Sequence, residues 1–221
     1  MRLGDGRHRE RTAVTPDRGV PAHRPLAGAL KETLIEGARQ LLAEKGADGF
    51  SLSELARRTG VSTAAPYRHF ESREALLGAV VVRGYEQMLD LLRTASLPGA
   101  TPLEQLKLFG VCYTRFAIEY PELFGILFSD RYRAVAGAAQ RASFEPLVDC
   151  VEQAQRAGQL SGAVPSNEVA RFLWSTAHGI TVLHLNGGIE TLGIDGSAER
   201  PHASAWDTFL SQVGPPPVPP A

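Results

Sequence analysis

Residues 51–73 have the sequence SLSELARRTGVSTAAPYRHFESR, and this stretch decides the fold. Ser51 and Glu54 have the spacing of a capping box, in which a hydroxyl and a carboxylate three residues apart satisfy free amides at the start of a helix. Gly60 is expected to end that helix near Thr59, because glycine readily adopts the left-handed conformation that follows a helix. The sequence therefore predicts one short helix between Ser51 and Gly60.

A second short helix is predicted to follow directly. It should start at Ser62 or Thr63, with the hydroxyl as its N-cap, and reach about Phe70. Pro66 then falls in or near the first turn, where its missing backbone donor costs little. Ala56 is small enough to let the two helices cross closely. Two short helices around a glycine turn predict a helix-turn-helix, whose second helix enters the DNA major groove in DNA-binding versions.

Helical spacing of apolar residues recurs along the rest of the chain, whereas the alternation typical of strands is almost absent. Further helices are predicted over 30–45, 73–94, 102–120, 122–128, 138–157, 167–186 and 203–213. Ser72, Thr101 and Ser166 are the expected N-caps of three of them, and Pro146 should mark a kink or a start within 138–157. The predicted fold class is all-α, with a three-helix helix-turn-helix domain followed by a helical C-terminal domain.

Composition divides the chain into four predicted parts. Residues 1–28 hold six Arg, three Pro and four Gly with little apolar periodicity, which predicts a flexible arm. Residues 29–94 should form the helix-turn-helix domain with a connecting fourth helix, and residues 95–214 the C-terminal domain. Residues 215–221 are rich in Pro and are expected to form a short stiff tail.

Several classes of protein are excluded by composition. The charged fraction of 21% is that of an ordinary soluble protein. The longest apolar run, 75–82, is far shorter than the roughly 20 residues that span a bilayer, and the first 28 residues lack the apolar core of a secretory signal. Cys112 and Cys150 are too few for a disulfide framework and are expected to be small buried side chains in a reducing compartment.

The stretch 51–73 is also basic, with four Arg and one His against two Glu, although the formal charge of the whole chain is −1. Hydroxyls and free amides at a helix start suit phosphate or a base edge. The candidate DNA-binding residues are Ser51, Leu52, Ser62, Thr63, Ala64, Tyr67, Arg68, His69 and Arg73. Side chains for bidentate base reading are scarce, so we expect mostly backbone contacts, with base contacts from Thr63, Ala64 and Ala65.

The string GVSTAAPYRHFESREALL, residues 60–77, closely resembles the DNA-binding domain of TetR-family transcriptional repressors. The resemblance covers about residues 30–82 and includes Tyr67, His69 and Phe70, which match the Tyr-x-His-Phe signature of the family. Phe50-Ser51-Leu52 resembles its opening of the second helix, and Arg73 stands where the family usually has Lys. The resemblance implies a homodimer on a near-palindromic operator and a C-terminal half that binds a small molecule and releases DNA.

The C-terminal half carries aromatic side chains at helical spacing, most of them expected in the core and some around an apolar cavity. The candidate ligand-binding residues are Phe109, Tyr113, Phe116, Phe124, Phe128, Trp174 and His178. Residues 120–124 and the Trp174-x-x-x-His178-Gly179 sequence resemble a TetR subgroup named for its Trp-His-Gly motif. Residues 167–186 are apolar on more faces than one subunit should cover, so this helix and the last one are expected to pair between subunits.

No metal site and no cofactor are predicted, because the six His lack the paired spacing of metal ligands and no phosphate-binding loop is present. We also expect no enzyme activity. Two alternatives stay open: a small helical enzyme that uses His178 with Glu119 or Asp149, and a sequence-blind architectural DNA protein, for which a far higher net charge is expected. The favoured hypothesis is a dimeric, cytoplasmic, nucleoid-associated repressor that a largely apolar effector releases from its operator.

Overall fold

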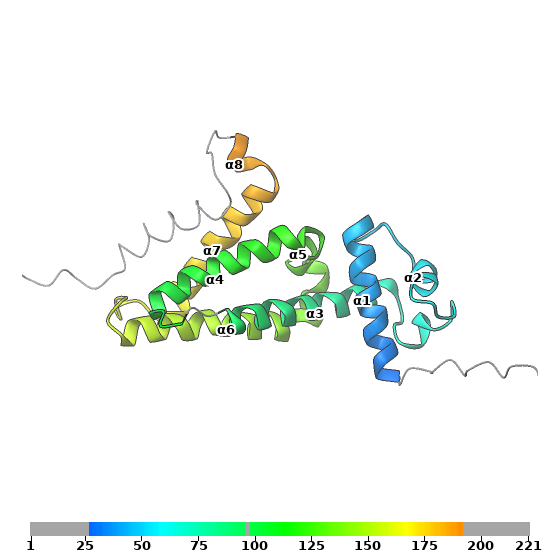
Figure 1. Ribbon diagram of the computed structural model, residues 1–221, viewed down its shortest axis with the longest axis horizontal. Coiled ribbons are helices and arrows are strands. Elements are labelled where there is room, and N and C mark those ends of the chain that lie inside the picture. The colour runs from blue at the N-terminus through cyan, green and yellow to red at the C-terminus, as the bar shows by residue number, and fades with distance from the viewer. Residues whose placement is uncertain (1–26, 96–97, 192–221) are drawn as a thin grey trace, which may run out of the picture.

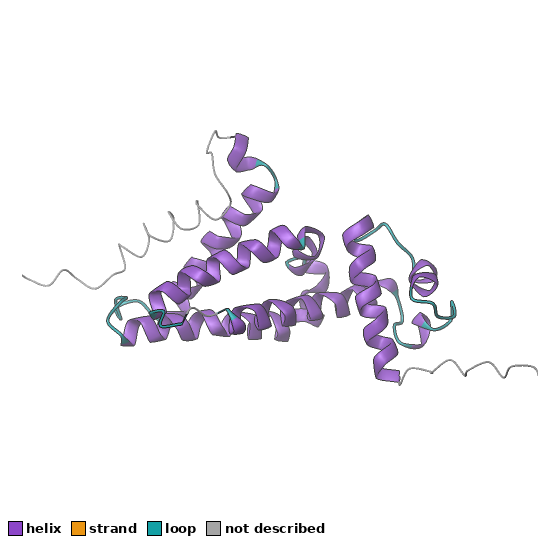
Figure 2. Cartoon of the chain, in the orientation of Figure 1, coloured by secondary structure: helices purple, strands orange, loops and turns teal. Residues whose placement is uncertain are grey.

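The computed structural model describes residues 27–95 and 98–191, and every regular element among them is a helix (Figure 2). The α-helices are α1 (Ala27–Lys45), α2 (Leu52–Arg58), α3 (Arg73–Thr94), α4 (Pro102–Glu119), α5 (Pro121–Leu127), α6 (Arg133–Arg156), α7 (Ser166–Leu185) and α8 (Gly188–Thr191). Two 3-10 helices are η1 (Pro66–Arg68) and η2 (Asp130–Tyr132). The all-α prediction is confirmed; the predicted arm, tail and helix 203–213 lie outside the described residues.

The helices form two groups that share one long helix (Figure 1). α1, α2 and η1 lie together at one end of the molecule, and α4, α5, α6 and α7 pack into a bundle that occupies most of the rest. α3 starts beside η1 and runs into the bundle, where α6 lies along it. A displacement of α3 within the bundle would therefore also move the start of α3, beside η1.

The predicted face of α1 is the core of the first group. Leu34, Ala38, Leu41 and Leu42 are fully buried. α1 also approaches the end of α2 closely, since a Cβ on Gly37 would lie 2.7 Å from Cγ2 of Thr59. α2 ends at Arg58, and Gly60 follows in the left-handed conformation with φ of 70°, as the sequence predicts.

Three of the expected helix caps are present. The Ser51 hydroxyl accepts a hydrogen bond from the Glu54 amide (3.2 Å), and the Ser72 hydroxyl accepts one from Ala75 (3.1 Å). The Glu54 carboxylate pairs with Lys45 rather than with the Ser51 amide, so this capping box is half formed. Thr101 and Glu104 form a complete one.

The predicted second helix of the motif is wrong in extent. Residues 63–65 form a turn, and only the short η1 follows, without a side-chain cap. The Ala65 amide donates to the Ser62 carbonyl (2.9 Å), but Pro66 has no amide to continue the helical ladder. In place of the continuous helix expected to reach Phe70, the segment is a turn followed by one 3-10 turn that Pro66 opens.

Two starts in the bundle also differ from prediction. α6 begins at Arg133 and contains Pro146 in its interior. Gly137 lies in its early turns, and glycine is a poor helix former that obscured this part of the pattern. α7 begins at Ser166 itself, and its N-cap position is Pro165. The Ser166 hydroxyl contacts the Glu152 carboxylate (3.4 Å) instead of capping the helix.

α7 carries the surplus of apolar surface that is expected for residues 167–186. Phe172, Leu183 and Leu185 of α7 are exposed, while Leu173 and Ala177 on the opposite side are buried. No helix within the described ranges is both long enough and apolar enough to cross a bilayer.

The turn between α1 and α2 should tolerate no side chain at Gly49, because a Cβ there would lie 2.0 Å from the Lys45 carbonyl oxygen. Gly49→Ala is expected to lower the free energy of unfolding by about 1–3 kcal/mol, since backbone must shift. Gly125→Ala is the control: nothing lies within 4 Å of its Cβ position in α5, and it should raise stability by about 0.5–1 kcal/mol. Urea unfolding of both variants measures the difference, and equal stabilities would contradict this account of the turn.

Candidate functional site

A polar surface follows the glycine turn of the helix-turn-helix. Its residues are Ser62, Thr63, Ala64, Tyr67 and Arg68, which are all exposed and are called the reader surface below. Tyr67 is 59% exposed. Arg68 makes no hydrogen bond or ion pair with the other described residues, so its guanidinium is available to a phosphate.

The reader surface stands on buried neighbours. Ala65, Pro66 and Phe70 are buried between its exposed residues, and Phe70 belongs to the hydrophobic core. The expected base contact of Ala65 is therefore wrong, because Ala65 is only 7% exposed. Lys31 of α1 lies over the Phe70 ring, with Nζ 5.9 Å from the ring centroid. The backbone that carries the exposed side chains is therefore held in place by these buried neighbours, although η1 is only three residues long.

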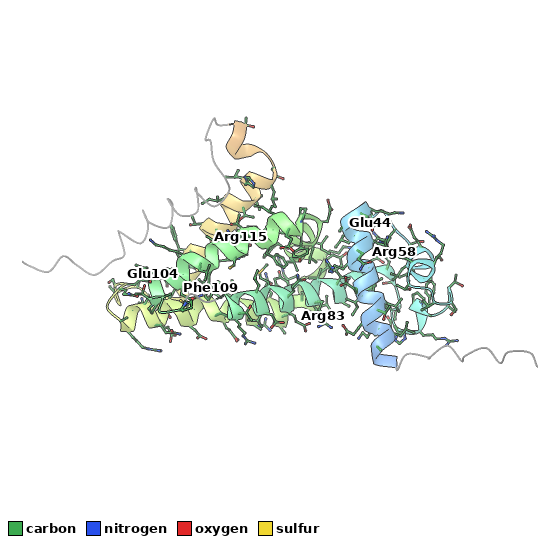
Figure 3. The ribbon with its side chains drawn as sticks, in the orientation of Figure 1. Glu44, Arg58, Arg83, Glu104, Phe109 and Arg115 are labelled. Atoms are coloured by element: carbon green, nitrogen blue, oxygen red, sulfur yellow. The ribbon has the colours of Figure 1, made fainter. Side chains whose placement is uncertain are left out.

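An ion pair fixes α2 against α1 beside this surface. The Arg58 guanidinium donates two hydrogen bonds of 2.5 Å to the Glu44 carboxylate (Figure 3). This bond holds the pKa of Glu44 below its ordinary value. Arg58 is thereby occupied within the protein, whereas Arg57 on the same helix keeps a largely exposed side chain.

Three predicted DNA-binding residues have surroundings that differ from those expected. Leu52 is 5% exposed and belongs to the core, so its side chain is unable to reach a ligand. His69 is half buried behind the reader surface. The Arg73 side chain is 19% exposed, and its guanidinium binds the Ala47 carbonyl and the Asp48 carboxylate (2.9 Å) and stacks over Phe50.

Arg73 is therefore already engaged by partners of its own chain through Nη1 and Nη2. That Arg73 holds a phosphate stays a prediction; in this structure its Nη2 is bound to Ala47 and Asp48. Ser51 remains exposed, but its hydroxyl is engaged as the cap of α2. The remaining candidates, those of the reader surface, lie together on one side of the turn.

A cavity of about 870 Å³ lies within the bundle, between α3, α4, α6 and α7. Its lining is mostly apolar and includes four of the predicted residues, Phe109, Tyr113, Phe128 and Trp174. Figure 3 marks Phe109 on α4 beside α6. Phe116 and Phe124 do not line it: both are buried in the core. A cavity of this size and character suits a small organic molecule.

His178 sits behind the cavity wall within a group of aromatic rings. Its ring centroid lies 4.6 Å from that of Phe128, and 5.6 Å from those of Phe124 and Trp174. Nδ1 of His178 is 2.8 Å from the Tyr113 hydroxyl. His178 therefore positions a cavity residue and is not itself part of the lining.

The protonation of this pair follows from burial. Burial raises the pKa of Tyr113 far above its ordinary range. A hydrogen bond with Trp174 acts in the opposite direction and lowers this pKa. Because the indole nitrogen is only a donor, the Tyr113 oxygen accepts that bond. The tyrosine proton is then free to be donated to Nδ1 of His178. Burial also lowers the pKa of His178, so the ring is neutral near pH 7, and its Nδ1 accepts from Tyr113 in the tautomer that carries the proton on Nε2.

The sequence did not single out several cavity residues. Tyr85, Met88 and Leu92 of α3 line one wall, and the Tyr85 hydroxyl donates to the Leu127 carbonyl (2.6 Å). These residues have the spacing of an ordinary helical core stripe, so only their position around the cavity distinguishes them. The polar residues at the cavity come from α6 and α7 and include Arg133, Gln140, Arg141, Glu145, Asn167, Glu168 and Arg171.

Within the described residues, no group of three or more His, Cys, Asp or Glu could hold a metal ion. Burial raises the pKa of Cys150 to about 11 and also raises that of Cys112. The Cys150 thiol donates to the Pro102 carbonyl (3.3 Å). Both are free thiols; Cys150 is buried as expected, whereas Cys112 is only half-buried. The raised pKa makes each a poor nucleophile.

The pairing that an enzyme based on His178 would need is not observed. Glu119 accepts a hydrogen bond from the Tyr120 hydroxyl (2.5 Å), and Nδ1 of His178 faces Tyr113. Asp149 is exposed on α6. The structure thus brings the predicted aromatic residues together around His178, and not a carboxylate.

The comparisons with known proteins agree with this architecture. Residues 34–80 match the model for bacterial regulatory proteins of the tetR family, and residues 106–204 match a tetracyclin repressor-like C-terminal domain. The chain belongs to the TetR family. The Trp-His-Gly subgroup is compatible with this membership but is not singled out by it.

Two curated relatives of this TetR-family chain align over the helix-turn-helix part. The class A tetracycline repressor of Escherichia coli is 43% identical over 68 residues, which is 31% of this chain and 30% of that protein. An HTH-type transcriptional regulator of Mycobacterium tuberculosis is 33% identical over 66 residues, 30% of this chain and 28% of its own length. The chain thus spans less than a third of the length of either relative.

A solved structure of unknown function from Rhodococcus sp. RHA1 resembles the whole fold. It is 28% identical, covers 88% of this chain and 98% of its own, and has a TM-score of 0.75. The likeness extends through the bundle that contains the cavity.

The lowered pKa of His178 predicts a pH dependence of stability. Below its ordinary value of 6.5, the unfolded chain takes up a proton that the buried ring resists, so the free energy of unfolding should fall as pH falls. His178→Gln keeps an acceptor for Tyr113 and should show a smaller loss. Urea unfolding of both proteins at about pH 7.5 and about pH 5.5 measures this, and an identical pH dependence would refute the assignment.

Proposed function

We propose that this TetR-family protein is a ligand-responsive transcriptional repressor that binds a near-palindromic operator as a homodimer. The observation that carries the proposal is the reader surface: hydroxyl, phenol and guanidinium groups lie exposed over buried Ala65, Pro66 and Phe70. A rigid, polar, cationic projection of this kind suits a DNA groove. The family membership supports the same conclusion.

Different residues of the reader surface have different roles in the proposal. Tyr67 and Arg68 donate to phosphates, because each is exposed and Arg68 has no partner among the described residues. Ser62, Thr63 and Ala64 lie nearest the glycine turn and meet base edges or thymine methyl groups. In the proposal Arg73 has a structural role: its contacts with Asp48 and Ala47 hold the start of α3 against the turn between α1 and α2.

Arg68→Ala is expected to weaken binding to every duplex. The logarithm of the affinity should fall less steeply with the logarithm of salt concentration, with the slope reduced by about one for each subunit, because one phosphate contact is lost. Fluorescence anisotropy over a salt series measures the slope.

Arg156→Ala is the matched control, since it removes the same charge from an ion pair with Glu152 inside α6. Thr63→Val should instead change the preferred sequence and leave the salt slope unaltered. An unchanged slope for Arg68→Ala would exclude the proposed phosphate contact.

The proposed effector is a small, largely apolar molecule in the bundle cavity. The 870 Å³ volume and the aromatic lining support this class of ligand. α3 contributes Tyr85, Met88 and Leu92 to the cavity and begins beside the reader surface. A ligand that favours one position of α3 would lower operator affinity by the ratio of its affinities for the two forms.

Filling the cavity tests its role. Gly137 of α6 lines the cavity, and Gly137→Phe should reduce binding of the apolar fluorophore 1-aminoanthracene at least tenfold by occupying its space. Ala138→Phe is the control, because Ala138 is exposed and does not line the cavity. Fluorescence titration measures both, and equal affinities would show that the probe binds elsewhere.

The proposed dimer contact is the outer face of α7. Thr176, Gly179 and Leu183 follow one another at helical spacing, and nothing lies within 4 Å of a Cβ on Gly179. Leu183 is 51% exposed. A glycine beside exposed apolar surface allows a second helix to approach closely, which supports pairing of α7 between subunits.

Leu183→Glu should shift the protein from dimer to monomer at micromolar concentration, because it buries a charge in the proposed contact. Ala138→Glu introduces the same charge at an exposed site on α6 and should remain dimeric. Sedimentation velocity distinguishes the two. A wild-type monomer at that concentration, or a dimer that survives Leu183→Glu, would contradict this contact.

A further inference from the structure

The short segment between α5 and α6 reaches across to the helix-turn-helix. Arg131 of η2 places Nη2 2.7 Å from the Glu74 carboxylate, in the first turn of α3. Its Nη1 lies 4.0 Å from the carboxylate of Asp48, in the turn between α1 and α2. One side chain of the bundle thus contacts two elements of the group that carries the reader surface.

A second arginine shares the same carboxylates. Arg73 lies 2.9 Å from Asp48 and 3.4 Å from Glu74. We call Asp48, Arg73, Glu74 and Arg131 the charged cluster. The pKa of Glu74 is held below its ordinary value, first by a hydrogen bond to its own amide and then by Arg131 and Arg73. The two positive and two negative side chains therefore neutralise one another.

The inner side of the charged cluster is buried. Arg73 stacks over Phe50 at 5.6 Å, and Tyr132, next to Arg131, is 4% exposed. Nε of Arg73 and the hydroxyl of Tyr132 are buried without a hydrogen-bond partner among the described residues. Unpartnered polar groups are unfavourable in a protein interior, so the arrangement must be held by other contacts, and the ion pairs of Arg131 are available for this.

The helix that follows Arg131 also borders the effector cavity. Arg133 and Gly137, in the first turns of α6, line it. Between them Val135 packs on α3, where a Cβ on Gly78 would lie 3.1 Å from Val135 Cγ1. The start of α6 is therefore in contact with the cavity, with α3 and, through Arg131, with the turn before α2.

We propose that Arg131 is a positioning residue that orients the helix-turn-helix relative to the bundle through Glu74 and Asp48, and so contributes to operator affinity without touching DNA. The inference rests on the proposed function, because the quantity it sets is the placement of the reader surface. The carboxylates of Glu74 on α3 and Asp48 in the α1–α2 turn both lie within 4.0 Å of the Arg131 guanidinium, so one side chain connects both elements to the bundle. Loss of the Arg131 charge leaves two carboxylates facing Arg73 alone.

The first test is a double-mutant cycle on the full chain. Arg131→Gln and Glu74→Gln should each weaken binding of a duplex selected by the wild type about threefold, as expected for a partly exposed ion pair. The double variant should be weakened by less than the product of the two single effects, because both variants remove the Arg131–Glu74 pair, while each also loses one further contact of its own, to Asp48 or to Arg73. Arg131→Lys should recover part of the affinity, and Arg156→Gln, the matched loss of one charge, should change nothing.

The second test does not depend on DNA. Amide hydrogen exchange in residues 46–50 should be faster in Arg131→Gln than in wild type, with the melting temperature and the exchange of α7 unchanged. Unchanged exchange in 46–50, or unchanged or tighter duplex binding by Arg131→Gln, would overturn the proposal. If wild type selects no duplex, the proposed function fails, and the exchange measurement alone decides whether Arg131 positions this turn.

Discussion

Side-chain burial, together with a short run of helical hydrogen bonds, holds the segment that carries the reader surface. Pro66 donates no backbone hydrogen bond, and η1, which Pro66 opens, supplies a single turn. Burial of one aromatic side chain such as Phe70 contributes about 1.5–3 kcal/mol, which is enough to fix so short a segment on the core. The positions of Thr63 and Tyr67 consequently depend on the packing of α1, α2 and α3 beneath them.

The same dependence links the two groups of helices. α3 begins with the half-buried Arg73 and continues into the wall of the cavity at Tyr85 and Met88. No separate transmission element is needed, because one rigid helix belongs to both sites. The charged cluster adds a second connection at the start of α6. Ligand binding and operator binding would thus be coupled by packing and by charge, with α3 common to both.

Local chemistry made much of this predictable from sequence. The hydroxyl caps at Ser51, Ser72 and Thr101 and the left-handed Gly60 act between near neighbours, and they located the helices and the turn. Contacts between distant segments were not predictable. Nothing in the sequence reveals that Arg73 turns inward to Asp48, or that Phe124 belongs to the core while Phe128 borders the cavity. Pro66 was placed correctly, but its effect on the following turns was underestimated.

The central claim is that the reader surface recognises a particular duplex sequence. Selection of bound fragments from random genomic DNA by the purified full chain, at physiological salt, tests it most directly. The account predicts that the retained fragments share one near-palindromic sequence with two half-sites about one helical turn apart. Retention of no fragments, or of fragments without a common sequence, would contradict it.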